Sequence, residues 1–412
     1  MPRHWAIFLI TSANFFLSQF YRASMAVIAP ELLQELHLNT RQLGMISAAF
    51  FYAFALAQIP ISIFLDKIGA RRLMTALSII GIAGAVLFSR ADSFADGILA
   101  RALLGLGMSC NLMGTLKLMT LWFKPTQFAT ISGFIFSIGT VGNMAATAPF
   151  VALARHMGWR DSFVAIAALN FLIVIVLYLV VRDRPGHSAS RENPGSIDQK
   201  LSQTLGNLAL LLRKKDFWII SVSTLVGYGT FAAFQTLWAG PYLIEVIRLS
   251  AMEAGNVIFL MNLGMIIGAP AWGALSDNVF KNRKWIIFSG ALCTAAVMLV
   301  FAGKSAPPAA ITMAVLFFCF GVSRSAGLLM YPHIKELVPL NTAGAAMTGL
   351  NFFTMMGPAV FLQGLGYLMQ ALYPEASRGV LAFQAAFYVC MGCLLFTALL
   401  YAFAREKKLA SY

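Results

Sequence analysis

Long apolar stretches separated by short polar turns dominate the chain. Twelve of them hold about 20 mostly apolar residues each, the length that an α-helix needs to cross a bilayer. Their approximate limits are 5–29, 42–65, 73–91, 94–122, 127–152, 161–181, 217–243, 254–275, 285–303, 309–332, 343–370 and 381–403. The stretch from Trp5 to Ala29 is too long for a signal peptide and lacks a convincing cleavage site. The pattern therefore predicts an all-α membrane protein with twelve transmembrane helices.

One long polar interruption, 182–216, separates six predicted spans from six more. We expect an N-terminal six-helix bundle at 1–181, a cytoplasmic connector at 182–216 and a C-terminal six-helix bundle at 217–412. Within the connector, four leucines recur at helical spacing and predict an amphipathic helix on the membrane surface: Leu201, Leu205, Leu208 and Leu212.

Composition and charge agree with a membrane protein. Hydrophobic residues make up 59% of the chain and charged residues 11%, against about 45–50% and about 25% in soluble domains. With the N-terminus inside the cell, 19 Lys and Arg residues fall on the cytoplasmic side and seven on the other. The positive-inside rule then places both termini in the cytoplasm, on the inner membrane if the cell is Gram-negative. The net charge of +14 thus reflects topology, and no nucleic-acid partner is expected.

Four cationic residues remain within the predicted spans: Arg22, Arg101, Lys117 and Arg324. No Asp or Glu lies well inside a span, because all 16 acids are in loops or at span ends. A charge near the bilayer centre costs several kcal/mol and normally faces a cavity or a partner. A bound anion would supply the missing negative charge.

Two loops at matching places in the halves form an internal repeat. Asp66-Lys67-Ile68-Gly69-Ala70-Arg71-Arg72 follows the second span, and Gly273-Ala274-Leu275-Ser276-Asp277, then Lys281, Arg283 and Lys284, follows the eighth. This repeat resembles the G-x-L-x-D-R-x-G-R-R loop of the major facilitator superfamily, although Ser62 replaces the first Gly and the second copy lacks the central one.

Further motifs extend the resemblance over most of the chain. Arg101-Ala-Leu-Leu-Gly105-Leu-Gly107 is similar to the family's R-x-x-Q-G-x-G motif, with Leu104 in place of Gln. Small residues in the fifth and eleventh spans, which let helices approach closely, match as well: Gly139, Gly142, Pro149, Gly357 and Pro358. The resemblance implies two pseudo-symmetric six-helix bundles, alternating access, and a central cavity lined by spans 1, 4, 7 and 10.

The resemblance also implies roles for the paired loops and for protons. Asp66, Arg71, Arg72 and Asp277 are expected to hold the cytoplasmic side closed. Uptake by proton symport is the family expectation. Protons could couple through Asp66, through His333 or through protonation of the substrate itself, or transport could be facilitated diffusion without coupling. For His333 alone, a solvated loop histidine is the default interpretation. We expect a monomer in the lipid bilayer.

Arg22 is the leading candidate for holding the anion. Asn14, Ser18 and Arg22 are spaced i, i+4 and i+8 and form a polar stripe beside Tyr21. These four residues and Lys117 are candidate substrate contacts. A guanidinium can bind a carboxylate or phosphate with two parallel hydrogen bonds. The Tyr-Arg pair resembles the anion-binding arginine of the organic anion branches of the superfamily. The alternative is an arginine that reaches toward the outer headgroups.

The other intramembrane cations have structural alternatives. Arg324 is expected in the cavity, or else bonded to the carbonyls of a broken helix. Arg101 has a structural role as often as a substrate role in the family, and Lys117 can reach the cytoplasmic interface. Neutral contacts are expected from Tyr228, Gln235 and Trp238. Interhelical hydrogen bonds are the simpler role for these three and for Tyr52, Gln58, Asn111, Asn262 and Asn351.

No enzyme, metal or cofactor signature is present. A P-loop, HExxH and GxSxG are all missing, and the five cysteines show no metal-ligand spacing. The sequence predicts a secondary transporter of a small organic anion that is held by Arg22 and Arg324, with Arg101 assisting. The alternatives are a drug or metabolite exporter of the same fold and an anion-sensing membrane receptor.

Overall fold

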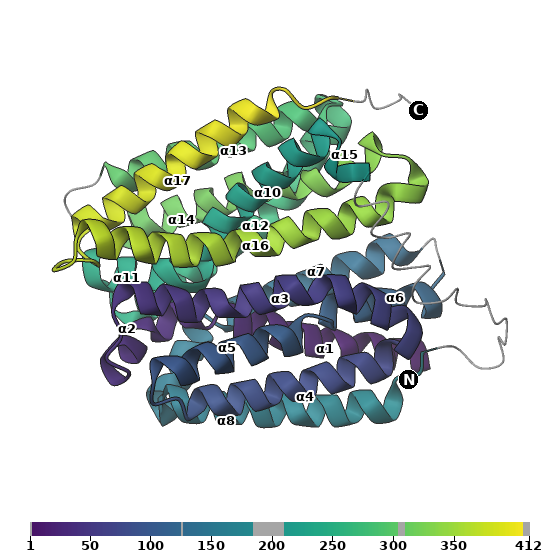
Figure 1. Cartoon of the computed structure of the whole chain (residues 1–412), viewed down its shortest axis with the longest axis horizontal. Coiled ribbons are helices and arrows are strands. Elements are labelled where there is room, and N and C mark those ends of the chain that lie inside the picture. The colour runs from purple at the N-terminus through teal and green to yellow at the C-terminus, as the bar shows by residue number, and fades with distance from the viewer. Residues whose placement is uncertain (1, 125–126, 184–209, 304–309, 407–412) are drawn as a thin grey trace. The chain divides into compact units, whose positions relative to one another are not determined.

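The computed structural model describes residues 2–124, 127–183, 210–303 and 310–406, and every regular element in these ranges is a helix (Figure 1). In this part of the chain, nine helices are long and apolar enough to cross a membrane, and Thr130–Ala145 is a shorter apolar helix. Each of the twelve expected spans falls on one helix or on consecutive helices. The expected connector helix at Leu201, Leu205 and Leu208 lies outside the described residues.

Contacts divide the chain into two units. Unit 1 comprises Met1–Met25 and Ala49–Gln203, and unit 2 comprises Ala26–Ala48 and Thr204–Tyr412. The expected division into bundles at the 182–216 connector stays a prediction, because the contact units differ from it in the short segment 26–48.

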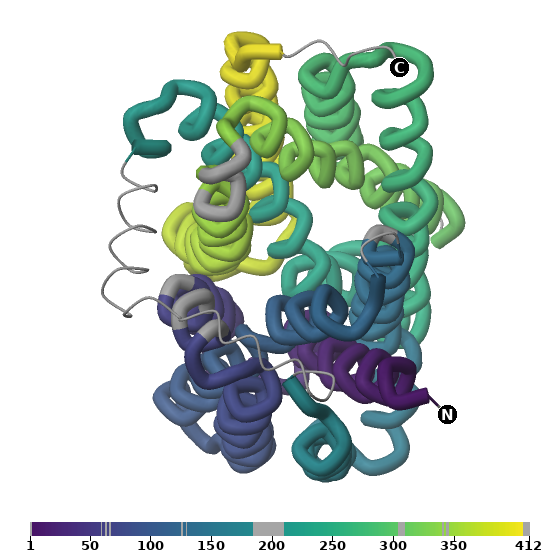
Figure 2. The backbone as a smooth tube through the Cα atoms, turned by 90° about the vertical axis from the view of Figure 1, so that its right-hand side faces the viewer, coloured from purple at the N-terminus to yellow at the C-terminus, as the bar shows by residue number. Residues whose placement is uncertain are grey.

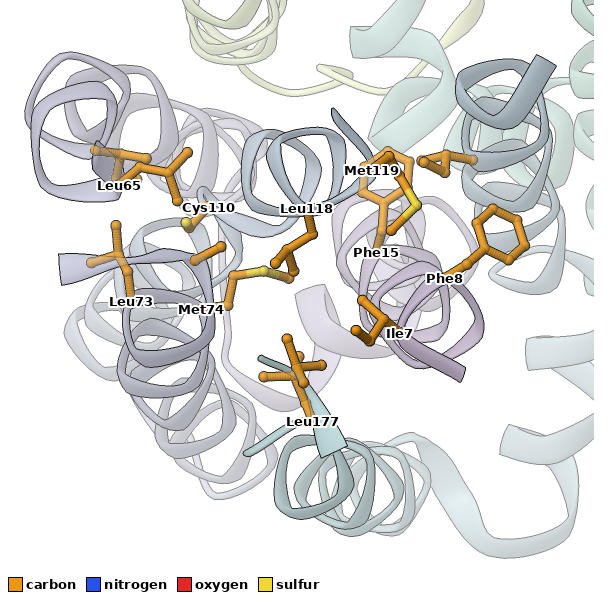
Figure 3. Packing of buried hydrophobic residues seen from close by; sticks show 14 of the residues in the cluster. Ile7, Phe8, Phe15, Leu65, Leu73, Met74, Cys110, Leu118, Met119 and Leu177 are labelled. Carbon is orange, nitrogen blue, oxygen red and sulfur yellow. The ribbon is translucent and has the colours of Figure 1, made fainter. Parts of the chain in front are cut away.

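Unit 1 holds the helices of the first six spans. They are α1 (Arg3–Ala23), the second part of α3 (Thr40–Ile68), α4 (Ala70–Ser89), α5 (Phe94–Met108), α6 (Asn111–Trp122), α7 (Phe128–Ala145) and α8 (Ala148–Val180). α8 contains the end of the fifth expected span and the sixth. Gly158, at φ 79°, lies between these two parts, and the backbone leaves the helical conformation there. Buried side chains from α1, α3, α4, α6, α7 and α8 form the core shown in Figure 3, to which Ile7, Met74, Leu118 and Leu177 belong.

Unit 2 holds the later spans together with α2 (Met25–Glu35) and the start of α3. Its other helices are α10 (Lys215–Ala233), η2 (Phe234–Trp238), α11 (Ala239–Pro241), η3 (Tyr242–Val246), α12 (Ala251–Ala274), η4 (Leu275–Val279), α13 (Arg283–Ala302), α14 (Ala310–Ser325), η5 (Ala326–Leu329), α15 (Met330–Leu337), α16 (Leu340–Leu372) and α17 (Val380–Tyr401). Figure 2, where this part of the chain runs from teal to yellow, shows several of these helices nearly end-on as a bundle.

Local sequence explains where several helices begin. Ser93 Oγ accepts a hydrogen bond from the Asp96 N–H and caps α5. Ser250 and Glu253 form a capping box at the start of α12. Asn282 Oδ1 accepts from the Trp285 N–H at 2.9 Å and caps α13. Such side chains satisfy backbone donors that a helix leaves without intrahelical partners.

Equivalent helix pairs pack in the two units. α1 packs on α7 and α4 on α8 in unit 1, and α10 packs on α16 and α13 on α17 in unit 2. Numbered by the predicted spans, the pairs are 1–5 and 3–6 in unit 1, and 7–11 and 9–12 in unit 2. A Cβ added at Gly142 of α7 would collide with the Phe16 carbonyl of α1, and one at Gly357 of α16 with the Leu225 carbonyl of α10. The expected role of these glycines in close helix approach is confirmed.

The segment 26–48 packs on helices of unit 2. The Thr40 hydroxyl is hydrogen-bonded to that of Ser377 at 2.7 Å, and the Thr40 N–H donates to Gln370. The guanidinium of Arg41 lies over the Tyr367 ring, 5.4 Å from its centroid. The start of α3 thereby contacts α16 and the loop that follows it.

Candidate functional site

Arg22 lies in the last turn of α1, beside a break in the helix. α1 ends at Ala23 and α2 begins at Met25, and between them Ser24 Oγ donates to the Tyr21 carbonyl at 3.1 Å. The Arg22 side chain is buried, with 8% of its surface exposed. The first span therefore carries its cation at an interruption of the regular helix.

Arg101 supports the same break from α5. Its Nη1 donates to the Tyr21 carbonyl at 2.8 Å, and its guanidinium lies over the Phe50 ring, 4.9 Å from the centroid. The side chain is fully buried, and no hydrogen-bond acceptor of the described residues reaches its Nε or Nη2. These contacts attach Arg101 to the backbone that carries Arg22.

The rest of the predicted stripe on α1 faces the interior of unit 1. Asn14 Nδ2 donates to Asn111 Oδ1 at 2.9 Å and to Ser78 Oγ at 3.0 Å, while Asn170 Nδ2 donates to Asn14 Oδ1 at 2.9 Å. Ser18 Oγ donates to the Met108 carbonyl at 3.2 Å. Asn14 thus joins α1 to α4, α6 and α8. Its bond to Asn111 is the interhelical hydrogen bond expected from the sequence as the simpler role for Asn111.

Tyr21 and Lys117 are also engaged within unit 1. Tyr21 is fully buried, its ring centroid lies 6.0 Å from that of Phe20, and its hydroxyl has no hydrogen-bond partner among the described residues. Lys117 Nζ donates to the Leu65 carbonyl near the end of α3. The turn at Gly69, at φ 89°, ends that helix and removes the usual intrahelical donor to this carbonyl.

Arg324 is the buried cation of unit 2. It lies in the last turn of α14, immediately before the 3₁₀ turn η5, and 8% of its surface is exposed. In the part of the chain that the structure describes, no carboxylate forms an ion pair with it. Tyr228 of α10 is close enough to interact electrostatically with the guanidinium. Arg324 and Tyr228, predicted separately, are therefore brought together.

A polar group on neighbouring helices extends this site. The Tyr331 hydroxyl of α15 lies within hydrogen-bond distance of two polar atoms of α16, 3.2 Å from Asn351 Oδ1 and 3.0 Å from Thr354 Oγ1. Tyr228 of α10 also lies near Tyr331. Sequence reasoning missed Tyr331 and Thr354. The signal for Tyr331 was its position seven residues after Arg324, two helical turns along the same span.

Gln235 and Trp238 lie further along the seventh span, in the π-helical turn η2. The Gln235 amide donates to Asn262 Oδ1 of α12, and both side chains are buried. Trp238 is 1% exposed, and Cβ atoms added at Gly44 and Gly366 would lie 3.3 and 3.1 Å from its ring. Both residues make packing contacts within unit 2.

The predicted gating residues form different contacts in the two units. Arg71 Nε donates to the Tyr178 carbonyl at 2.8 Å, and its backbone N–H donates to Asp183 Oδ1 at 2.9 Å. Arg72 is exposed, and the side chain of Asp66 lies outside the described residues. In unit 2, Asp277 accepts from Arg283 Nη1 at 3.0 Å, and Glu336 accepts from Arg283 Nε at 2.7 Å.

One carboxylate after the last span of each half caps the start of that half's third span. Asp183 accepts from the Arg71 N–H at the start of α4. Glu406 accepts from the N–H groups of Arg283 and Lys284 at 3.0 and 2.9 Å, at the start of α13. Sequence reasoning missed this repeated contact, whose signal was an acid just beyond the sixth and twelfth spans.

His333 is not solvated, contrary to the default expectation. The side chain is fully buried, Nδ1 lies 2.6 Å from the Tyr401 hydroxyl, and Nε2 lies 3.0 Å from the Arg405 carbonyl. The default was wrong because α15 continues past Pro332 and turns His333 toward α17. Its role in proton coupling stays a prediction.

Metal chemistry finds no support in the part of the chain that the structure describes. No group of three or more His, Cys, Asp or Glu side chains there could hold a metal ion. The chemistry that the two units offer is cationic: Arg22 and Arg101 at the α1 break, and Arg324 beside Tyr228.

Comparison with known proteins identifies the family. The family model described as "Major Facilitator Superfamily" matches residues 10–362, with a second match at 238–411. A hexuronate transporter of Bacillus subtilis (strain 168) is 24% identical over 82% of this chain and 82% of its own. A probable galactarate/D-glucarate transporter of Escherichia coli (strain K12) is 24% identical over 94% and 90%, respectively.

Solved structures share the fold. A bacterial homologue of the human lysosomal transporter Spinster, inward-facing and unoccupied, matches with a TM-score of 0.77 at 16% identity, covering 98% of this chain and 97% of its own. A D-xylose-proton symporter matches with a TM-score of 0.78 at 13% identity, covering 97% of each chain. At these identities the likeness shows the fold alone.

Proposed function

The chain belongs to the major facilitator superfamily, and we propose that it is a secondary transporter of a small organic anion that carries a carboxylate, such as a sugar acid. It is a multi-pass membrane transporter and not an enzyme. The proposal includes alternating access, proton-coupled uptake, and both termini in the cytoplasm. The excess of Lys and Arg on one side of the predicted spans supports that orientation.

The buried position of Arg324, without a carboxylate partner among the described residues, is the observation that carries the substrate class. A buried charge needs a counter-charge or dense hydrogen bonding. The sequence places no Asp or Glu well inside a span. An anionic substrate meets this need, and the relatives named above as hexuronate and galactarate/D-glucarate transporters carry substrates of that class.

We assign the direct substrate contacts to Arg22 and Arg324, with Tyr228 as a neutral neighbour of Arg324. Arg101 assists by holding the backbone at the α1 break. Asn14, Ser18 and Tyr21 then serve the packing of unit 1, because their side chains point into it. Lys117 likewise has a structural role, because its ammonium group donates to a carbonyl near the end of α3.

Uptake into proteoliposomes tests the proposal. Purified protein is supplied with a radiolabelled hexuronate, aldarate or aldonate, with and without an inward proton gradient. We expect saturable uptake of at least one acid, inhibition by unlabelled acids, and strong loss in Arg22→Lys and Arg324→Lys. Arg41→Lys, a charge-conserving change at an exposed arginine, is the matched control and should transport normally.

The same assay separates the alternatives. Binding of an acid without flux would identify a sensor and overturn the transport proposal. Flux of cationic or neutral drugs with no effect of acids would identify an exporter and overturn the anion proposal.

A further inference from the structure

Two glycines of unit 2 lie against the guanidinium of Arg324. A Cβ added at Gly227 of α10 would stand 2.8 Å from Cζ of Arg324 and 2.9 Å from both Nη1 and Nη2. A Cβ added at Gly327 of η5 would stand 2.6 Å from Cζ and from Nη2, and closer still to Nη1. Each is nearer to Arg324 than real Cβ atoms come to any neighbour.

These distances show where the glycines lie relative to the guanidinium plane. A carbon in the plane beyond one nitrogen would be much closer to that nitrogen than to the other two atoms. At Gly227, near-equal distances to Cζ, Nη1 and Nη2 place the carbon over the flat face instead, whereas the shorter distance to Nη1 at Gly327 places that carbon beside the Nη1 end of the group. Gly227 therefore leaves room for the face of the Arg324 guanidinium, and Gly327 leaves room for its Nη1 end.

Other glycines of unit 2 differ in what a Cβ would meet. At Gly264 and Gly321, which lie where α12 crosses α14, the nearest atoms are backbone carbonyls of the opposite helix. At Gly227 and Gly327 the three nearest atoms all belong to the Arg324 side chain. Helix crossing thus accounts for the first pair, and accommodation of a planar cation accounts for the second.

We infer that Gly227 and Gly327 form a slot that holds the Arg324 guanidinium at one face and at its Nη1 end, so that the remaining edge, Nε and Nη2, binds a carboxylate through two parallel hydrogen bonds. This inference rests on the proposed function and adds a specificity determinant to it. A guanidinium held in this way is pre-organised for edge-on pairing with a carboxylate. Lysine has no planar group and cannot use the slot.

Alanine at either glycine tests the slot. Gly227→Ala and Gly327→Ala should each weaken binding of the transported acid at least tenfold, because a methyl group displaces the guanidinium. Gly364→Ala is the matched control, since a Cβ there meets no atom within 4 Å, and it should bind like the wild type. In an Arg324→Lys background, Gly227→Ala should have little further effect, because the planar group that it displaces is gone.

A second readout needs no substrate. Phenylglyoxal modifies accessible arginine side chains, and mass spectrometry measures the extent at Arg324. Displacement from the slot should speed modification of Arg324 in both glycine variants and leave it unchanged in Gly364→Ala. If Gly227→Ala alone fails to fold, the Gly227→Ala, Arg324→Lys double variant should fold, since the steric conflict is with the guanidinium.

The two readouts separate this inference from the proposed function. Faster modification with no binding of any acid by the wild type would support the slot and overturn the anion proposal. Acid binding by the wild type with unchanged affinity and unchanged modification in both glycine variants would overturn the slot alone. Failure of the double variant to fold would likewise overturn the slot, because the conflict would then lie elsewhere.

Discussion

Arg101 Nη1 donates a hydrogen bond to the carbonyl oxygen of Tyr21 at 2.8 Å, at the point where α1 gives way to α2. A carbonyl at the end of a helix has no intrahelical donor, and here Arg101 and Ser24 supply two. The next residue along the chain is Arg22. Arg101 thus fixes the backbone from which Arg22 extends, and we assign it a positioning role.

The two arginines should respond differently to lysine. Arg101→Lys keeps one donor for the Tyr21 carbonyl and a cation beside the Phe50 ring, whereas Arg22→Lys loses the two-pronged contact with the anion. We expect Arg22→Lys to lower affinity for the acid by more than tenfold and Arg101→Lys to lower it by a few-fold. Isothermal titration of both purified variants measures this, and equal losses would place Arg101 in direct contact with substrate.

Asn14 should be important for stability and less so for substrate affinity. Asn14→Ala leaves the amide of Asn170 without its acceptor and removes one donor from Asn111, all in a buried setting. The free energy of unfolding should fall by about 1–3 kcal/mol. Thermal unfolding in detergent measures the loss, and Ser137→Ala, at an exposed serine of α7, is the control. A strong loss of affinity with unchanged stability would return Asn14 to the substrate site.

Asp183 and Glu406 should stabilise their units independently. Each caps the first turn of a helix, and loss of a capping side chain costs about 0.5–2 kcal/mol. Asp183→Ala and Glu406→Ala should each lower the unfolding temperature. Because the two contacts are in different units and share no partner, the shift of the double variant should equal the sum of the single shifts. A double variant no less stable than either single variant would show that the caps are coupled.

The Tyr401 hydroxyl should matter for packing around His333 more than for protons. Tyr401→Phe removes the partner of His333 Nδ1 in a fully buried place, which costs about 1–3 kcal/mol. We expect a lower unfolding temperature and an unchanged ratio of uptake between mildly acidic and neutral buffer. Loss of that pH dependence would indicate that this pair takes part in proton coupling.

The fold could be predicted from the sequence because lipid imposes a strong pattern. Twelve apolar stretches and two matching basic loops were enough to predict the helices and the family. The close-packing roles of Gly142 and Gly357 were also visible, because small residues at equivalent places indicate a helix crossing. The helix break after Arg22 was not visible, because neither proline nor glycine lies at it.

The candidate site could be predicted only in part. Arg22 and Arg324 stood out because a cation within an apolar span is costly. Helical spacing placed Asn14 and Ser18 on the stripe with Arg22, yet both side chains bond to other helices of unit 1. Spacing along one helix cannot show which neighbours surround it. Gly227 and Gly327 were overlooked for the same reason, since their importance comes from a side chain on another element.

A comparison of an acid with its amide tests the central claim, that buried arginines hold an anion. The affinity of purified protein for a transported carboxylate is measured beside that of the uncharged amide of the same molecule. Breaking a buried charge pair costs about 3–5 kcal/mol, so the amide should bind more than a hundredfold more weakly. Binding of the amide within tenfold of the acid would show that Arg324 needs no negative charge from the substrate, and would contradict the account.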